Sequence, residues 1–333
     1  MSEPLVKVED LKVYFPVRRG LLGKTLYVKA VDGVSLEIGR GQIVTLVGES
    51  GCGKTTLGKT IAGLIRPTGG RVLYRGRDIW RMSREEWREY RRSVQIIHQD
   101  PYASLNPTKT IFSTLAAFLR RWGVARSRGE LVEKASELLE MVGLTPPEDF
   151  LWKYPHQLSG GQRQRVVIAR AISLRPSMIV ADEPITMIDV SLRIGILDLM
   201  LDLQRRLGSS YLFITHDFGA ARYFTAKGGG VIAVMYLGHI VEMGPAEDVI
   251  HDPQHPYTKV LLSAVPVPDP ELSRKKKPIM LRSLDIPSPI NPPSGCKFHT
   301  RCPYAFDKCS SEAPPLVEVK PGHYAACWLH GEG

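Results

Sequence analysis

The chain has 333 residues, of which 43% are apolar and 23% are charged, as expected for one large globular domain with an appendage or for two ordinary domains. No apolar run approaches the roughly 18 residues that cross a bilayer, and the N-terminal MSEPLVKVED lacks a signal-peptide core, so we expect neither a spanning helix nor export. The formal net charge of +10 favours an anionic partner, but it does not distinguish nucleic acid, a membrane surface and nucleotide phosphates.

From Leu5 to about Leu262, short β-branched runs alternate with longer amphipathic stretches, which predicts an α/β domain over residues 1–262. The predicted strands cover residues 5–15, 31–38, 43–47, 94–98, 177–182, 211–215 and 231–236. Within 111–142 the apolar positions recur at helical spacing, so residues 102–172 are predicted to form a helical subdomain. We interpret the AKGGG stretch at 226–230 as a loop.

After Leu262 the composition changes. Residues 263–293 are rich in proline and lysine and are predicted to form a connector with little helix or strand. Residues 294–333 form a short tail that contains four of the five cysteines. The sequence therefore predicts three parts: the α/β domain, the connector and the cysteine-bearing tail.

The segment 48–56 reads GESGCGKTT and follows the apolar run 43–47, so strand, glycine-rich turn and helix start come in the order that a phosphate-binding loop requires. Glycines let backbone amides crowd around phosphate oxygens, while Lys54 can reach the β- and γ-phosphates and Thr55 can ligate Mg²⁺. The predicted nucleotide-binding residues here are Gly48, Ser50, Gly51, Cys52, Gly53, Lys54, Thr55 and Thr56. A glycine turn with a surface lysine is the alternative, and the strand before it disfavours that alternative.

An acidic pair ends the predicted strand 177–182. A carboxylate pair at the carboxyl edge of an α/β sheet lies where such folds place their chemistry. We expect Asp182 to bind Mg²⁺, directly or through water, and Glu183 to polarise the water that attacks the γ-phosphoryl group. Two acids opening a solvated turn would be an equal alternative without the phosphate loop.

Between these motifs lies LSGGQ at 158–162, followed by RQRVVIARA. With this pair of motifs the sequence resembles the ABC ATPases, a P-loop α/β fold with a helical subdomain. A serine at a helix start, two glycines and free amides can hold a phosphate without a lysine. The resemblance implies that Ser159, Gly160, Gly161 and Gln162 contact the nucleotide of a second subunit in a head-to-tail dimer.

Further positions match the family pattern. The resemblance implies that Gln99 senses Mg²⁺ and water, that His216 contacts the γ-phosphate and positions the water of Glu183, and that Asp189 lies at the dimer seam. The residues 186–188 before Asp189 are bulkier than usual in the family. An aromatic residue near the start, Phe15 or Tyr14, would stack on adenine, and Phe15 fits better by its distance from Lys54.

The segment HPYTKVLLSAVP at 255–266 and the cysteine tail resemble the dipeptide/oligopeptide branch of ABC importer ATPases. That implies an ATP-hydrolysing subunit at the cytoplasmic face of the cell membrane that energises import of peptides. The implied partners are two permease subunits, a second ATPase that is a sibling of this chain, and indirectly an extracytoplasmic substrate-binding protein. Alternatives are import of short oligosaccharides, a soluble ABC ATPase acting on nucleic acid or ribosomes, and a regulatory module without turnover; we expect no nucleic-acid partner.

Cys296, Cys302, Cys309 and Cys327 lack the C-x2-C pair of zinc ribbons. Four thiolates suit either a [4Fe–4S] cluster or a zinc ion, and the spacing does not decide between them. The family resemblance implies the [4Fe–4S] cluster. Its expected role is structural, because four ligands would hold together a tail that is too short to form its own core. Zinc and free or paired thiols are the alternatives.

Overall fold

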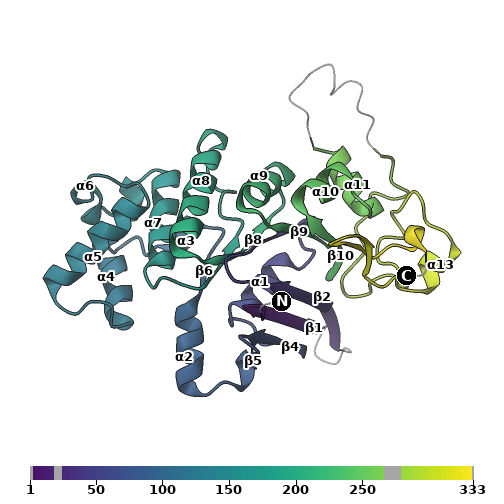
Figure 1. Ribbon diagram of the computed structural model, residues 1–333, viewed down its shortest axis with the longest axis horizontal. Coiled ribbons are helices and arrows are strands. Elements are labelled where there is room, and N and C mark those ends of the chain that lie inside the picture. Colours follow the sequence, from purple (N-terminus) through teal and green to yellow (C-terminus); the bar gives the residue numbers. More distant parts are fainter. Residues whose placement is uncertain (1–2, 19–24, 266–278, 332–333) are drawn as a thin grey trace.

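The computed structural model describes residues 3–18, 25–265 and 279–331 (Figure 1). Within these ranges the strands form two sheets, a four-stranded antiparallel sheet in the order β2-β1-β4-β5 and an eight-stranded mixed sheet in the order β11-β12-β10-β9-β3-β8-β7-β6. The strands are β1 (Val6–Arg18), β2 (Thr25–Ile38), β3 (Ile43–Val47), β4 (Gly69–Tyr74), β5 (Arg77–Asp78), β6 (Val94–Ile97), β7 (Met178–Asp182), β8 (Ser210–Thr215), β9 (Val231–Tyr236), β10 (His239–Pro245), β11 (Val317–Lys320) and β12 (His323–Ala325). The helices are α1 (Lys54–Ile61), α2 (Arg84–Ser93), α3 (Pro101–Ser104), α4 (Ile111–Arg121), α5 (Arg128–Met141), α6 (Glu148–Leu151), α7 (Gly160–Ile172), α8 (Val190–Leu207), α9 (Phe218–Gly228), α10 (Ala246–His251), α11 (Pro256–Ser263) and α13 (Asp307–Ser311).

The centre of the larger sheet is parallel: β3 pairs with β8 and β9, and β7 pairs with β6 and β8. Every residue of β3, β7 and β8 is buried, which explains their continuous apolar runs. Strands occur at all seven of the predicted places. The sequence analysis missed β4, the two-residue β5, β10 and the two short tail strands, whose patterns are interrupted by polar residues.

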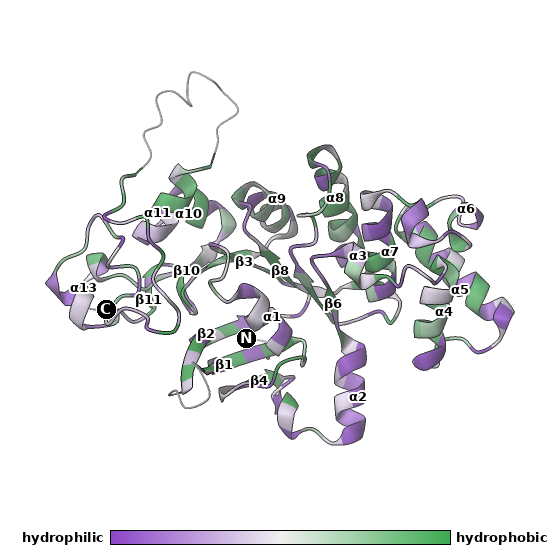
Figure 2. Cartoon of the chain, turned by 180° about the vertical axis from the view of Figure 1, so that it is seen from behind, coloured by the Kyte–Doolittle hydropathy of each residue, from purple (hydrophilic) through white to green (hydrophobic). Residues whose placement is uncertain are grey.

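Alternate residues of the central strands enter two different cores. Ile43, Ile179 and Phe213 pack on the side of α7, α8 and α9, whereas Leu46, Val180 and Ile214 pack towards α1 and the antiparallel sheet. Figure 2 shows this contrast of polarity: the central strands are hydrophobic, and the outlying helix α2 is mostly hydrophilic. The parallel sheet is therefore covered on both faces.

The segment from α3 to α7 is helical, with no strand between residues 102 and 172 in the described structure. Ser127 begins α5 with a capping box, in which its hydroxyl accepts from the N–H of Glu130 and the Glu130 carboxylate accepts in return. Leu115, Leu139 and Val167 from three of these helices share one core. No helix among the described residues combines the length and apolar character needed to cross a bilayer.

The cysteine-bearing tail joins the larger sheet. Strand β12 pairs with β10, so the sheet continues from the nucleotide-binding half into the tail (Figure 1). Phe298 and Cys302 of the tail share a core with Tyr236 and Tyr257. Residues 266–278 of the predicted connector lie outside the described residues. The boundaries at 262 and 294 stay a prediction.

The interpretation of 226–230 as a loop is wrong for residues 226–228, which form the last turn of α9. Gly229 ends this helix with a left-handed backbone, at a φ of 67°. A Cβ at Gly230 would lie 2.1 Å from the carbonyl oxygen of Ile43. The glycines let the end of α9 approach β3 closely. The sequence analysis missed this role because it treated glycines only as residues that form loops.

We expect Gly230→Ala to lower the free energy of unfolding by about 1–3 kcal/mol, because the new methyl group meets rigid backbone. The matched control is Gly195→Ala in α8, where no atom lies within 4 Å of the added Cβ. There the higher helix propensity of alanine should leave stability unchanged or raise it by up to ~1 kcal/mol. Chemical denaturation of both variants checks this. Equal stability of the two would contradict the close-approach account.

Candidate functional site

An open pocket of about 440 Å³ lies at the carboxyl edge of the parallel strands. Its lining combines the phosphate loop with the ends of β6, β7 and β8: Ser50, Gly51, Gly53, Lys54, Thr55, Thr56, Gln99, Glu183, Thr186 and His216, together with Val28, Ala30 and Pro289. Parallel pairing of β3, β7 and β8 brings these loops to one edge, although the residues are far apart in the sequence. Six of the eight residues predicted in the phosphate loop therefore meet Gln99, Glu183 and His216 in one place.

The phosphate loop leads from β3 into α1 through a glycine that no other residue can replace. Gly53 is the N-cap of α1 with a φ of 108°, and a Cβ there would lie 1.9 Å from the carbonyl oxygen of Ala30. The ammonium of Lys54 donates to the carbonyl oxygens of Gly48 and Glu49, at 2.7 and 2.9 Å. Lys54 is thus held inside the loop in the position from which it can turn to a phosphate.

Thr55 and Asp182 are joined directly. The Thr55 hydroxyl donates to Oδ1 of Asp182 over 2.9 Å. Burial raises the pKa of the Asp182 carboxyl, while the hydrogen bond from Thr55 opposes that rise. A hydroxyl and a carboxylate in contact beside a phosphate loop are the oxygen ligands that Mg²⁺ prefers.

The carboxylate of Glu183 is the centre of a second cluster. Its Oε2 accepts from the amide of Gln99 and from the hydroxyl of Thr186, both at 3.1 Å, and Nδ1 of His216 lies 3.2 Å from the same oxygen. Glu183 itself has a φ of 47°, an uncommon conformation for a residue other than glycine. The structure brings the three predicted catalytic residues together. Thr186 was missed because a threonine in a bulky loop carries no signal by itself.

The LSGGQ residues lie elsewhere. Ser159 is the exposed N-cap of α7, where its hydroxyl accepts from the N–H of Gln162 and the Gln162 side chain accepts from the N–H of Ser159. Neither these residues nor Gly160, Gly161 and Asp189 line the pocket around Lys54. Asp189 is exposed and lies at the N-terminus of α8. Within one chain, then, the sequence-predicted site is split into two separated halves.

Large apolar side chains are exposed beside the LSGGQ half. Met187, Val190, Leu192 and Ile194 are between 45% and 74% exposed. They lie close to LSGGQ, since a Cβ on Gly161 would be 3.3 Å from Cδ1 of Leu192. We call these four residues the seam patch. Such a cluster of exposed apolar side chains is typical of a surface that another protein covers.

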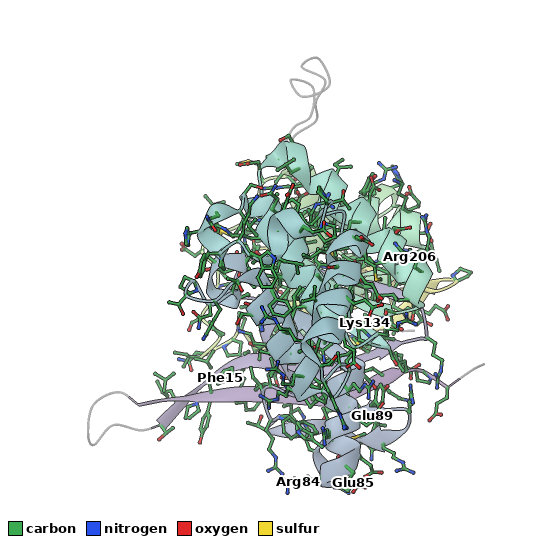
Figure 3. All side chains as sticks on the ribbon, turned by 90° about the vertical axis from the view of Figure 1, so that its left-hand side faces the viewer. Phe15, Arg84, Glu85, Glu89, Lys134 and Arg206 are labelled. Atoms are coloured by element: carbon green, nitrogen blue, oxygen red, sulfur yellow. The ribbon has the colours of Figure 1, made fainter. Side chains whose placement is uncertain are left out.

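Phe15 does not line the pocket. It is 40% exposed on the long β1–β2 ribbon, near the edge of the molecule (Figure 3). Its cross-strand partner Val28 does line the pocket, as does Pro289, whose carbonyl oxygen accepts from the N–H of Lys29. The sequence analysis missed Val28, Ala30 and Pro289, because apolar residues far from the motif give no chemical signal. Stacking of adenine on Phe15 stays a prediction.

The four tail cysteines are gathered but not in ligand geometry. No group of three or more His, Cys, Asp or Glu side chains in the described ranges is arranged so that it could hold a metal ion. Burial raises the pKa of the Cys296 thiol to about 11 and that of Cys327 to about 12, and charge on the other tail thiols adds to both shifts. Backbone N–H groups two residues further on hydrogen-bond to the sulfurs of Cys296, Cys302 and Cys327.

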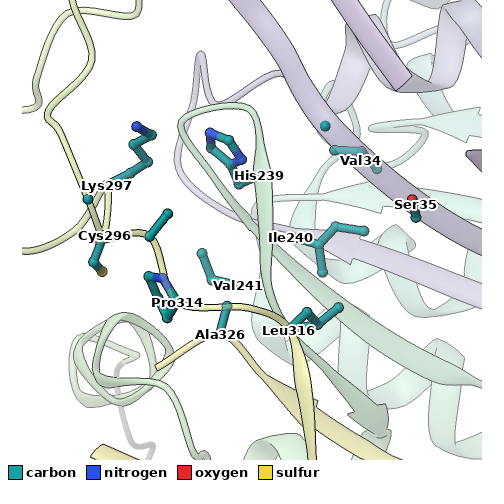
Figure 4. Close-up of a pocket in the computed structure, with 13 residues that line it drawn as sticks. Val34, Ser35, His239, Ile240, Val241, Cys296, Lys297, Pro314, Leu316 and Ala326 are labelled. Atoms are coloured by element: carbon teal, nitrogen blue, oxygen red, sulfur yellow. The ribbon is translucent and has the colours of Figure 1, made fainter. Parts of the chain in front are cut away.

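Such N–H donors stabilise thiolates, so the donor chemistry fits a four-thiolate group. Next to these cysteines lies a cavity of about 270 Å³ between β2, the β9–β10 hairpin and the tail (Figure 4). Cys296 and Lys297 form its tail side, and His239 and Ile240 form the hairpin side. The tail is thus incompletely packed on the side that carries Cys296.

Known proteins resemble this chain over nearly its whole length. Residues 31–186 match the family model described as ABC transporter, and residues 241–309 match the one described as oligopeptide/dipeptide transporter, C-terminal region. The oligopeptide transport ATP-binding protein AppF of Bacillus subtilis is 44% identical over 99% of this chain and 98% of its own length. The oligopeptide transport ATP-binding protein OppF of Salmonella typhimurium is 44% identical over 97% of this chain and 95% of its own length.

A similar solved structure is the dimeric, post-hydrolysis state of the ATP-binding cassette MJ0796 bound to ADP and phosphate. It is 29% identical, has a TM-score of 0.61, and covers 72% of this chain and 98% of its own. The likeness covers the nucleotide-binding fold rather than the whole chain.

The fifth cysteine, Cys52, yields a prediction about alkylation. It is 4% exposed within the phosphate loop, and burial raises the pKa of its thiol. We expect iodoacetamide to modify it at least about tenfold more slowly than a free thiol at neutral pH. Because its sulfur lies 3.8 Å from the Lys54 ammonium, the adduct should displace Lys54 and abolish ATP binding.

Mass spectrometry of the Cys52 peptide and a nucleotide-binding assay follow the two effects. Cys52→Ala, treated identically, controls for modification of the tail cysteines and should keep its ATP binding. Full modification of Cys52 with undiminished ATP binding would contradict the expected clash.

Proposed function

The chain belongs to the ATP-binding subunits of ABC transporters of the oligopeptide/dipeptide type, and we propose the residues through which it hydrolyses ATP. It is an ATPase that powers import of peptides. The observation that carries the proposal is the single oxygen of Glu183 on which Gln99, Thr186 and His216 converge, next to Lys54 and the Thr55–Asp182 pair.

The proposed roles follow from this geometry. Lys54 leaves the carbonyls of Gly48 and Glu49 to bind the β- and γ-phosphates, and the loop amides from Ser50 to Thr56 surround the remaining oxygens. Thr55 and Asp182 hold Mg²⁺. Glu183 polarises the attacking water. Gln99 and His216 both contact the Glu183 carboxylate, and they hold it in position relative to the γ-phosphate.

We infer that the second half of the site comes from another ATPase subunit. Ser159 is exposed at the N-terminus of α7, and Gly160, Gly161 and Gln162 follow it away from their own pocket. The seam patch and Asp189 are exposed as well. A head-to-tail dimer would cover the seam patch and place this cap on the partner's γ-phosphate. The dimeric state of the similar cassette MJ0796 supports this arrangement. A sibling ATPase is the proposed mate.

The remaining partners are two permease subunits and, indirectly, a substrate-binding protein, which would place the chain peripherally on the cytoplasmic face of the membrane. A groove between α2 and α4 offers a docking place for a permease. Its lining is basic and aromatic: Arg84, Trp87, Arg88, Arg91, Phe118, Arg121 and Trp122. Arg84 and its neighbours on α2 stand clear of the main body (Figure 3). The groove suits a short helix that carries acidic and apolar side chains.

The four cysteines are proposed to hold a [4Fe–4S] cluster, with zinc as the alternative. Support comes from four thiols in one small tail and from the N–H donors at three of the sulfurs. Such a group would crosslink the tail through its cysteines and so stabilise the side of the tail that borders the cavity.

We expect Glu183→Gln to lower ATP turnover by at least about a hundredfold, because the amide cannot polarise water. ATP-dependent association with the sibling ATPase should persist, since the phosphate contacts are intact. Phosphate release and size-exclusion chromatography measure the two effects. Glu133→Gln, on the exposed side of α5, serves as the control and should hydrolyse ATP normally. Undiminished hydrolysis by Glu183→Gln would contradict the proposed chemistry.

Protein purified without oxygen should be brown and contain about four iron atoms and four sulfides per chain. The measurement is elemental analysis with an absorbance spectrum. Replacing Cys302 by serine should lower the iron content and the thermal stability of the tail. A colourless protein with about one zinc per chain would exclude the cluster.

A further inference from the structure

Glu49, the residue after the first glycine of the phosphate loop, is held by three separate groups. Its carboxylate is paired with Arg301, its N–H donates to the hydroxyl of Tyr257 at 2.9 Å, and its carbonyl oxygen accepts from Lys54 at 2.9 Å. Two of these partners come from the C-terminal third of the chain.

The ion pair with Arg301 is bidentate, and its arginine side is buried while Glu49 is partly exposed. Arg301 Nη1 and Nη2 donate to the two carboxylate oxygens of Glu49 over 2.7 and 2.9 Å, across 252 residues of sequence. Arg301 is 4% exposed, and its guanidinium lies 5.8 Å from the ring centres of Tyr236 and Phe298. Planar, two-point pairing at a buried position fixes direction as well as distance.

Breaking this pair would leave the Glu49 carboxylate without its partner, in the same loop whose backbone carbonyl oxygens bind the Lys54 ammonium. The Lys54 side chain already contacts the Glu49 carbonyl, so a freed carboxylate has a cation within the same short loop. An ion pair between Glu49 and Lys54 would occupy the lysine that must bind the phosphates. Arg301 thus keeps an acidic loop residue away from Lys54.

We propose that Arg301 is a positioning residue for ATP binding, through which the cysteine-bearing tail holds the phosphate loop open for the triphosphate. This proposal rests on the proposed nucleotide site, and it adds Arg301 as a residue that influences ATP binding there. A contact from the connector that precedes the tail points the same way, since Pro289 lines the nucleotide pocket and its carbonyl oxygen accepts from the N–H of Lys29. Anything that loosens the tail next to Cys302 then lowers ATP affinity without touching the catalytic groups.

The test compares variants of the full chain for binding of a fluorescent ATP analogue and for KM and kcat. Arg301→Met should weaken binding about tenfold, as expected when the competent loop is about a tenth populated, with kcat at saturating ATP retained. Adding Glu49→Gln should restore binding towards that of the unmodified chain, because the competing carboxylate is gone. A purely structural loss would not be reversed by this second change.

Two control variants give the expected upper and lower limits of analogue binding. Lys320→Met removes an exposed tail cation paired with Asp252 and should bind the analogue normally. Lys54→Ala should lose binding. If the unmodified chain binds no analogue, the proposed function itself fails; if it binds and Arg301→Met binds equally well, only the role of Arg301 fails.

A poorly folded Arg301→Met protein would be recognised by its thermal unfolding. Arg301→Lys, which keeps the charge but loses the second hydrogen bond, then decides the question. We expect it to bind the analogue two- to fivefold more weakly. Binding by a folded Arg301→Lys chain that is as weak as that of Lys54→Ala, with no recovery on adding Glu49→Gln, would overturn the proposal.

Discussion

The hydrogen bond from Thr55 to Asp182 is the constraint on which the site depends, because it joins the phosphate loop after β3 to the acidic end of β7. It forms only if β3, β8 and β7 lie side by side in parallel and in register. The same register places Glu183 within reach of Gln99 after β6 and His216 after β8. The buried, mostly apolar strands therefore serve the chemistry by fixing the positions of the loops that follow them.

The tail is part of this machinery rather than an appendage. Strand β12 extends the central sheet through β10, and Arg301 of the tail contacts Glu49 in the phosphate loop. Tyr257 of α11 contacts the same loop residue. The position of the phosphate loop is thus determined both by its own glycines and by contacts with distant segments of the chain. In an importer ATPase, this arrangement links the folding of the tail to the affinity for nucleotide.

Sequence reasoning succeeded where the signal is local. The phosphate loop, the acids after 177–182 and the strands around them are contiguous patterns whose spacing demands one geometry. It failed where a residue matters through a distant contact: Arg301 meets Glu49 across 252 positions, and Pro289 reaches the pocket from a proline-rich segment. The glycines near 230 were interpreted as a loop, but glycine also occurs where two backbone segments pack closely, as at Gly230.

The most direct test of the central claim is a structure of this chain with its mate ATPase, Mg²⁺ and a non-hydrolysable ATP analogue. The account predicts that Lys54 of one subunit and Ser159 of the other contact the same γ-phosphate, with Mg²⁺ held by Thr55 and Asp182. A triphosphate enclosed by a single chain, or one whose metal ion lies away from Thr55 and Asp182, would contradict it.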